Sequence, residues 1–151
     1  PAFSILRSSA DRRADEGPVS AIVELASRQR EHIAMRCLLV EDNKVLGDAL
    51  RDHLNSLGHS ADWCLTLCDA TAAVGAGAFD LVLLDLNLPD GNGLSLLKRL
   101  RTANDATPVI VLTAYDQMSD RMNAISSGAT DFLVKPFNLS ALTNAISAIQ
   151  H

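Results

Sequence analysis

The sequence predicts an α/β fold, a doubly wound parallel sheet with helices on both faces. Short apolar runs typical of buried strands alternate along the chain with segments of helical periodicity. Glycine and proline residues separate the two kinds of segment. Several apolar runs also end in a charged residue or a hydroxyl. Functional groups in open α/β sheets gather beyond the carboxyl ends of the strands, so the pattern predicts a site as well as a fold.

The apolar run at residues 81–84 is the centre of this pattern, because Asp85 follows it directly. Its leucine and valine residues predict a strand that is buried on both faces. Pro89 and Gly91 indicate a loop after the strand, and the apolar spacing over residues 94–100 predicts a helix. Strand, acidic end, turn and helix together form one half of an α/β unit.

Further apolar runs predict four more strands, and helical spacing predicts five helices. The strands are expected at residues 37–40, 61–65, 107–113 and 131–136, and the helices at 45–57, 68–74, 94–102, 118–127 and 139–149. Met118, Met122 and Ile125 are expected to form the apolar face of the fourth helix. In the last helix, Leu142 and Ile146 are interpreted as core residues in preference to a partner surface.

The charge balance argues against nucleic acid as a direct partner. The 151 residues suffice for one domain with a hydrophobic core. They include 13 Lys or Arg and 18 Asp or Glu, a net charge of −5, and the whole acidic excess lies after residue 34. A net acidic domain does not attract DNA phosphates through its overall field, and no basic stripe is visible.

Residues 1–34 differ from the rest of the chain. They contain a charged cluster at 11–16, followed by Gly17 and Pro18. We interpret them as an N-terminal extension, a linker or an added segment, partly helical, and expect the domain itself at 35–151. The alternative is a helix that docks on a partner or on a second copy of the chain.

The sequence also predicts a cytoplasmic protein without a membrane contact. No run approaches the roughly 18 apolar residues of a membrane helix, and no signal-peptide core is visible at the N-terminus. The three cysteines lack paired metal spacing and are interpreted as reduced thiols. The four histidines, equally scattered, are expected at surface positions.

Polar residues lie at or just beyond the ends of four of the predicted strands and would share one edge of the sheet. They are Glu41, Asp42, Asp85, Thr113 and Lys135. Three carboxylates brought close together repel one another, and a hard divalent ion such as Mg²⁺ resolves this with oxygen ligands. A metal, a lysine and a hydroxyl together indicate a phosphoryl-transfer site with Asp85 as nucleophile. Each residue alone would suit a turn, a strand or solvent, so the hypothesis rests on their joint occurrence.

Residues 36–149 resemble the receiver domain of two-component response regulators, the family that includes the single-domain chemotaxis regulator. The resemblance rests on the motifs LLVEDN at 38–43, LLDLNLPDGNG at 83–93, VLTA at 111–114, GA at 128–129 and FLVKPF at 132–137. It implies the flavodoxin-like strand order 2-1-3-4-5. It also implies a phosphoprotein switch that is not an enzyme beyond its own phosphorylation and dephosphorylation.

The resemblance assigns roles to the residues at the strand ends. Asp85 would accept a phosphoryl group from the phosphohistidine of a sensor histidine kinase. Mg²⁺ would be held by Glu41, Asp42, Asp85 and the backbone carbonyl of Asn87. Lys135 would pair with a phosphoryl oxygen.

Further roles concern switching and lifetime. Thr113 would hydrogen-bond to the phosphoryl group and move with Phe132, whose inward state would be held by packing because it lacks a hydroxyl. A cis peptide bond is expected at Lys135-Pro136. Asn87 and Tyr115 would tune the hydrolysis of the phosphorylated state.

The output implied by the resemblance is transcription regulation through an effector domain or a target protein. The signal would leave through the surface of the helix at 118–127, the last strand and the closing helix. A homodimer formed on phosphorylation is one route. Arg121 and Asp131 fit the charged dimer contact of winged-helix members, but Ala141 and Ala145 stand where an acid and an arginine are expected.

Two alternatives remain at this stage. The chain could be a stand-alone or non-phosphorylated receiver that acts as a constitutive binding module, although a fragment of a longer regulator is favoured. It could also be a phosphatase of the haloacid dehalogenase type. That family requires a second aspartate two residues after the first, where this chain has Asn87.

Overall fold

Five parallel strands form the sheet at the centre of the fold. The computed structural model describes residues 33–114 and 118–150. The strands are β2 (Arg36–Val40), β3 (Ser60–Cys64), β4 (Leu81–Asp85), β7 (Val109–Thr113) and β8 (Asp131–Val134). Their order in the sheet is β3-β2-β4-β7-β8, and every neighbouring pair is parallel. In chain order this is 2-1-3-4-5, so the predicted fold class is confirmed.

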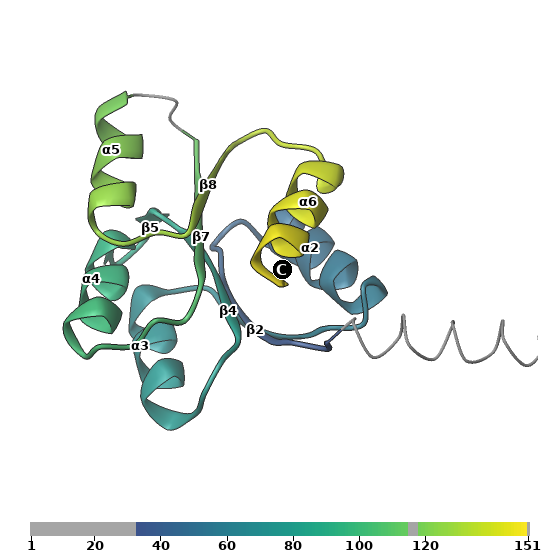
Figure 1. The fold of residues 1–151 in the computed structure, drawn as a ribbon, viewed down its shortest axis with the longest axis horizontal. Coiled ribbons are helices and arrows are strands. Elements are labelled where there is room, and N and C mark those ends of the chain that lie inside the picture. Colours follow the sequence, from purple (N-terminus) through teal and green to yellow (C-terminus); the bar gives the residue numbers. More distant parts are fainter. Residues whose placement is uncertain (1–32, 115–117, 151) are drawn as a thin grey trace, which may run out of the picture. The chain divides into compact units, whose positions relative to one another are not determined.

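Helices cover both faces of the sheet. They are α2 (Lys44–Ser56), α3 (Leu67–Ala76), α4 (Leu94–Thr102), α5 (Met118–Ser126) and α6 (Leu139–Gln150). Figure 1 shows α2 and α6 on one side of the sheet and α3, α4 and α5 on the other. Two clusters of buried residues fill the two layers, one around Leu50 and Leu142 and the other around Leu97 and Ala124.

The central strand β4 is buried along its whole length. It pairs with β2 on one side and with β7 on the other, and helices cover both of its faces. A strand in this position needs apolar side chains facing both ways, which explains its unbroken leucine and valine run. The carboxyl end of this rigid strand is therefore a fixed platform for Asp85.

A small hairpin follows β4 that the sequence pattern did not predict. The strands β5 (Asn87–Leu88) and β6 (Gly91–Asn92) pair antiparallel across Pro89 and Asp90. Strands of two residues are too short to show an alternating pattern, so only the turn residues could have signalled the hairpin. Gly91 has a φ of 154°, a conformation that favours glycine.

The predicted apolar face of α5 is wrong for two of its residues. Met122 and Ile125 are 60% and 58% exposed, whereas Ala124 is fully buried against the sheet side. Residues 118, 122 and 125 follow helical spacing, but so do 121, 124 and 128. Of the second set, Ala124 is buried in the core, where its small side chain packs against the other buried residues, whereas Arg121 and Gly128 are half-buried.

Other sequence-based expectations can be checked in the described residues. Leu142 and Ile146 lie in the core, as predicted. The prediction for His59 is wrong: it was expected at the surface but is buried with 4% exposure, and its Nδ1 is satisfied there by a hydrogen bond from the Met35 backbone N–H at 2.9 Å. The proposed extension at 1–34 lies almost wholly outside the described residues. Within the described part of the chain, the helices are too short or too polar to cross a bilayer.

Candidate functional site

The ends of four parallel strands bring the predicted site residues to one edge of the sheet. Asp85 is the last residue of β4 and Thr113 the last of β7, while Glu41 and Lys135 directly follow β2 and β8. The register aligns these ends, with Val40 opposite Leu84 and Thr113 opposite Val134. Parallel pairing therefore places residues separated by almost a hundred positions in the sequence side by side.

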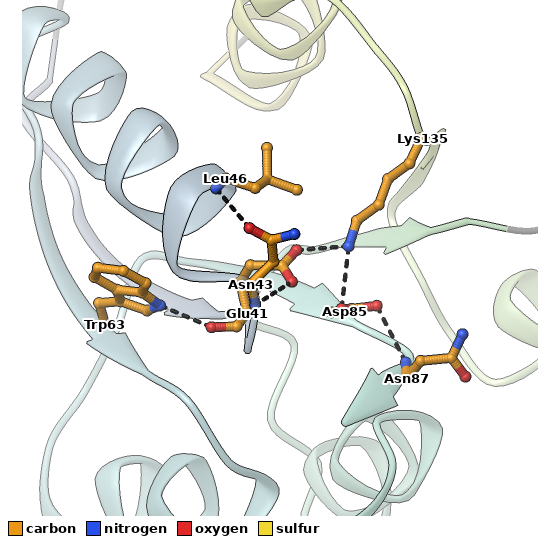
Figure 2. Close-up of polar contacts among 7 residues, drawn as sticks. All are labelled: Glu41, Asn43, Leu46, Trp63, Asp85, Asn87 and Lys135. Atoms are coloured by element: carbon orange, nitrogen blue, oxygen red, sulfur yellow. Dashed lines mark hydrogen bonds and ion pairs between the residues drawn. The ribbon is translucent and has the colours of Figure 1, made fainter. Parts of the chain in front are cut away.

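Lys135 joins two of the carboxylates. Its Nζ lies 2.7 Å from Oε1 of Glu41 and 3.1 Å from Oδ2 of Asp85 (Figure 2). The side chain of Lys135 is 19% exposed, whereas Glu41 is fully buried and Asp85 is 3% exposed. The Lys135 backbone N–H also donates to the Thr113 carbonyl at 2.6 Å, and the Lys135-Pro136 peptide bond is cis. The ammonium is thus held over the end of β4.

Burial and crowding set the protonation of this cluster. Burial raises the pKa of Glu41 from 4.5 to about 7; contact with Lys135 opposes the rise and the neighbouring Asp85 adds to it. Burial alone would lower the pKa of Lys135, but contact with Glu41 and the charge of Asp85 raise it above 10.5. The lysine is therefore a fixed positive charge, and Glu41 holds a proton more readily than an exposed carboxyl.

The carboxylates of Glu41, Asp42 and Asp85 fit a divalent cation. One oxygen of each lies within 4.8 Å of an oxygen of both others. Oε1 of Glu41 is fully buried, and among the described residues it has the ion pair with Lys135 at 2.7 Å but no hydrogen bond of good angular geometry. Hard cations such as Mg²⁺ take carboxylate oxygens and retain several waters, and the exposed Asp42 leaves one side of the cluster open to them.

Short-range hydrogen bonds fix the backbone around the carboxylates. The Asn87 N–H donates to Oδ1 of Asp85 at 3.1 Å, and the Asn43 N–H donates to Oε2 of Glu41 at 3.1 Å. Asn43 also caps α2, because its Oδ1 accepts from the Leu46 N–H at 3.0 Å. The acidic loop, residues 41–43, is therefore tied directly to the start of α2.

Of the remaining predicted site residues, Thr113, Phe132 and Asn87 are described by the structure and Tyr115 is not. Thr113 is 1% exposed at the end of β7, and Phe132 is half-buried against the core with the guanidinium of Arg121 over its ring at 5.2 Å. Asn87 is the first residue of β5, two positions after Asp85 at the end of β4. Tyr115 lies outside the described residues.

Two contributors to the site were missed from sequence. Trp63, which lies in the strand predicted at 61–65, donates from its indole N–H to the carbonyl of Glu41 at 2.8 Å. Asp90 accepts hydrogen bonds from the N–H groups of Leu67 and Cys68, both at 2.8 Å, and so ties the loop after β4 to the start of α3. A carboxylate in a Pro-Asp-Gly turn could have indicated the second; no sequence signal indicates the first.

Comparison with known families decides the assignment. Residues 37–147 match the family model of the response regulator receiver domain. The chain belongs to the response regulator receiver family. The predicted resemblance is thereby confirmed, and the acidic cluster, Lys135 and Thr113 lie within the matched segment of this receiver domain.

Relatives of this receiver domain are regulators of bacterial behaviour and transcription. The chain is 44% identical over 115 residues to the swarming motility regulation protein RssB of Serratia marcescens, covering 76% of this chain and 52% of that protein. It is 42% identical over 115 residues to the transcriptional regulatory protein PmrA of Pectobacterium parmentieri, with the same coverage. The chain thus spans about half the length of the curated relatives it matches.

Solved structures agree with the fold of the receiver domain. The non-phosphorylated HemR receiver domain from Leptospira biflexa is 35% identical, with a TM-score of 0.72, over 76% of this chain and 93% of that one. The Francisella response regulator 1452 receiver domain is 27% identical, with a TM-score of 0.73, over 77% and 96%.

Proposed function

We propose that this receiver domain is switched by phosphorylation of Asp85. The observation that carries the proposal is the position of its carboxylate, at the end of the buried strand β4 and 3.1 Å from the ammonium of Lys135. The domain is a regulatory one by its family. Its own chemistry would be limited to gaining and losing this phosphoryl group.

The transfer itself needs a phosphodonor such as a phosphohistidine. An oxygen of Asp85 attacks the phosphorus, the bond from phosphorus to the imidazole nitrogen breaks, and that nitrogen leaves with the electron pair and later takes up a proton. Lys135 stabilises the negative charge on the transferring oxygens. Its raised pKa supports this role, because the group stays charged throughout the physiological range.

A divalent cation would be held by Glu41, Asp42 and Asp85, with the backbone carbonyl of Asn87 as a further expected ligand. When bound, Mg²⁺ supplies positive charge that offsets the carboxylates and the phosphoryl oxygens. The cluster of three carboxylates and the buried Oε1 of Glu41 support this assignment.

Switching would begin at Thr113 and Phe132. Thr113 is the last residue of β7, next to the strand that carries Asp85, and this position supports a role in which its hydroxyl donates to a phosphoryl oxygen. A shift of Thr113 would change the space beside Phe132, which packs on the core and under Arg121. The surface formed by α5, β8 and α6 would then change shape. Asn87 and Tyr115 would set the lifetime of the phosphorylated state.

The partners are proposed from the relatives. A sensor histidine kinase would supply the phosphoryl group, and an effector domain or a target protein would receive the signal in the cytoplasm. Because the chain spans about half the length of transcriptional relatives such as PmrA, an effector domain in the same protein is favoured. Homodimerisation on phosphorylation stays a prediction, and Ala145, which stands where a dimer charge was expected, is buried with 6% exposure.

The test is phosphorylation by acetyl phosphate or phosphoramidate in the presence of Mg²⁺, followed by intact mass. We expect one added phosphate on the wild type and on the control variant Asp52→Asn, whose carboxylate is exposed on α2. Asp85→Asn should gain none. Equal labelling of Asp85→Asn and the wild type would contradict the proposal.

A further inference from the structure

Trp63 lies against the acidic loop from the side opposite Lys135. Figure 2 shows the two side chains on either side of Glu41. Trp63 belongs to β3, an edge strand of the sheet, and its indole N–H donates to the backbone carbonyl of Glu41 at 2.8 Å. The N–H of Glu41 donates to the carbonyl of Cys64 at 3.1 Å. Both backbone polar groups of Glu41 are therefore held by consecutive residues of β3.

The indole is fixed in turn by its packing. It lies over Gly47 in the first turn of α2, where a Cβ would come within 2.1 Å of the ring atom Cζ2. No side chain larger than hydrogen can occupy position 47 while the ring stays in place. The guanidinium of Arg51, one turn further along α2, lies 5.3 Å from the ring centre. The tryptophan thus connects β3, α2 and the acidic loop.

The Glu41 carbonyl that accepts from Trp63 affects the direction in which the Asp42 side chain leaves the backbone. It belongs to the planar peptide unit between Glu41 and Asp42, so holding the oxygen fixes ψ of Glu41 and φ of Asp42 together. The Glu41 side chain has its own contacts to Lys135 and to the Asn43 N–H. The exposed Asp42 carboxylate has no such hydrogen bond among the described contacts, so its backbone has to place it.

We propose that Trp63 is a positioning residue for the cation site: its indole N–H holds the peptide unit from which Asp42 projects. The inference rests on the proposed function, since it assumes that Glu41, Asp42 and Asp85 bind Mg²⁺. It adds a residue outside the strand ends to the site. It also makes Trp63, the only tryptophan of the chain, a spectroscopic reporter of the loop.

The experiment compares Mg²⁺ binding by calorimetry in the wild type, Trp63→Phe and Arg51→Ala. Phenylalanine keeps an aromatic ring on β3 and removes the donor. One hydrogen bond between neutral groups corresponds to roughly a twofold to tenfold change in affinity, so Trp63→Phe should weaken Mg²⁺ binding by that factor. Arg51→Ala removes the cation over the ring and an ion pair with Asp48 but keeps both the donor and the contact with Gly47, so its affinity should stay closer to that of the wild type than the affinity of Trp63→Phe.

A rate measurement separates positioning from loss of structure. The rate of phosphorylation by acetyl phosphate in Trp63→Phe should be lower at limiting Mg²⁺ and equal to the wild-type rate at saturating Mg²⁺. In the wild type, Mg²⁺ should also shift the Trp63 fluorescence and the indole ¹H–¹⁵N resonance. Substitution of benzothienylalanine at position 63, which keeps the bicyclic shape without the N–H, covers the case in which Trp63→Phe does not fold.

The outcomes distinguish this inference from the proposed function. Wild-type Mg²⁺ affinity in folded Trp63→Phe or in the benzothienylalanine protein would overturn the role of Trp63 and leave the role of Asp85 intact. A defect that persists at saturating Mg²⁺ would also overturn it. No saturable Mg²⁺ binding by the wild type would overturn both.

Discussion

The ammonium nitrogen of Lys135 lies 2.7 Å from Oε1 of Glu41, a carboxylate that is completely buried. Burial outweighs the attraction of the lysine and leaves the pKa of Glu41 at about 7. A cation that uses this carboxylate must therefore compete with a proton near neutral pH.

Mg²⁺ affinity should consequently depend on pH. Above pH 7 Glu41 is mostly ionised and binding is strongest; below pH 7 the apparent affinity should fall by up to about tenfold for each pH unit, because one proton is displaced. Calorimetry between pH 6 and 8 measures this, and buffers with different ionisation enthalpies count the released proton. Glu41→Gln should bind more weakly with little pH dependence in this range. An equally steep dependence in Glu41→Gln would assign the proton to another group.

Gly47 and Trp63 should be energetically coupled. Alanine has a helix propensity about 1 kcal/mol better than glycine, but in the wild type its Cβ would collide with the indole, and overpacking costs about 1–3 kcal/mol. Gly47→Ala should therefore destabilise the wild type and stabilise Trp63→Val, which lacks the ring. Urea unfolding of the wild type, the two single variants and the double variant gives the coupling free energy, which we expect to exceed about 1 kcal/mol. Additive effects would show that the ring moves aside without cost.

Arg101 should contribute to stability through the three hydrogen bonds that its guanidinium donates to backbone carbonyls. Its Nε and Nη2 donate to the Gly128 carbonyl at 3.1 and 2.9 Å, and Nη1 donates to the Asp105 carbonyl at 2.7 Å. Lysine cannot reproduce this geometry, so Arg101→Lys should lower the free energy of unfolding by about 1–2 kcal/mol. Arg99→Lys, an exposed position on the same helix, should change it by less than about 0.5 kcal/mol. Equal effects of the two substitutions would contradict the assignment.

Asp90 should stabilise the domain only while it is ionised. The N–H groups of Leu67 and Cys68 lower its pKa below 3.8, so its contribution is complete above that value and is lost as the pH falls through the lowered pKa. Asp90→Asn should therefore melt at a lower temperature than the wild type at pH 7, and the difference should shrink toward pH 3. A difference that is constant with pH would rule out a role for the ionised form.

The strand ends explain how far the sequence could predict this site. Parallel strands of similar length end at one edge, so the positions of Glu41, Asp85 and Lys135 in the chain were sufficient to bring them together. Asp42 and Thr113 follow from the same rule. The receiver motifs then added roles that spacing alone left open.

The sequence could not predict contacts that depend on side-chain direction between neighbouring elements. Trp63 has the pattern of an ordinary strand residue, and its bond to the Glu41 carbonyl depends on the register of β3 against β2 and on the space above Gly47. The burial of Ala124 in place of Met122 has a similar origin. Two helical faces fitted the sequence, and only the packing of α5 distinguishes them.

The central claim is that the phosphoryl group resides on Asp85, and mapping of the modified residue tests it most directly. Wild-type protein treated with acetyl phosphate and Mg²⁺ is reduced with borohydride, which converts an aspartyl phosphate into homoserine, and peptides are sequenced by mass spectrometry. We expect homoserine at position 85, and none there when Mg²⁺ is removed with EDTA. Homoserine at Asp42 or another acid, or no homoserine in protein that binds Mg²⁺, would contradict the account.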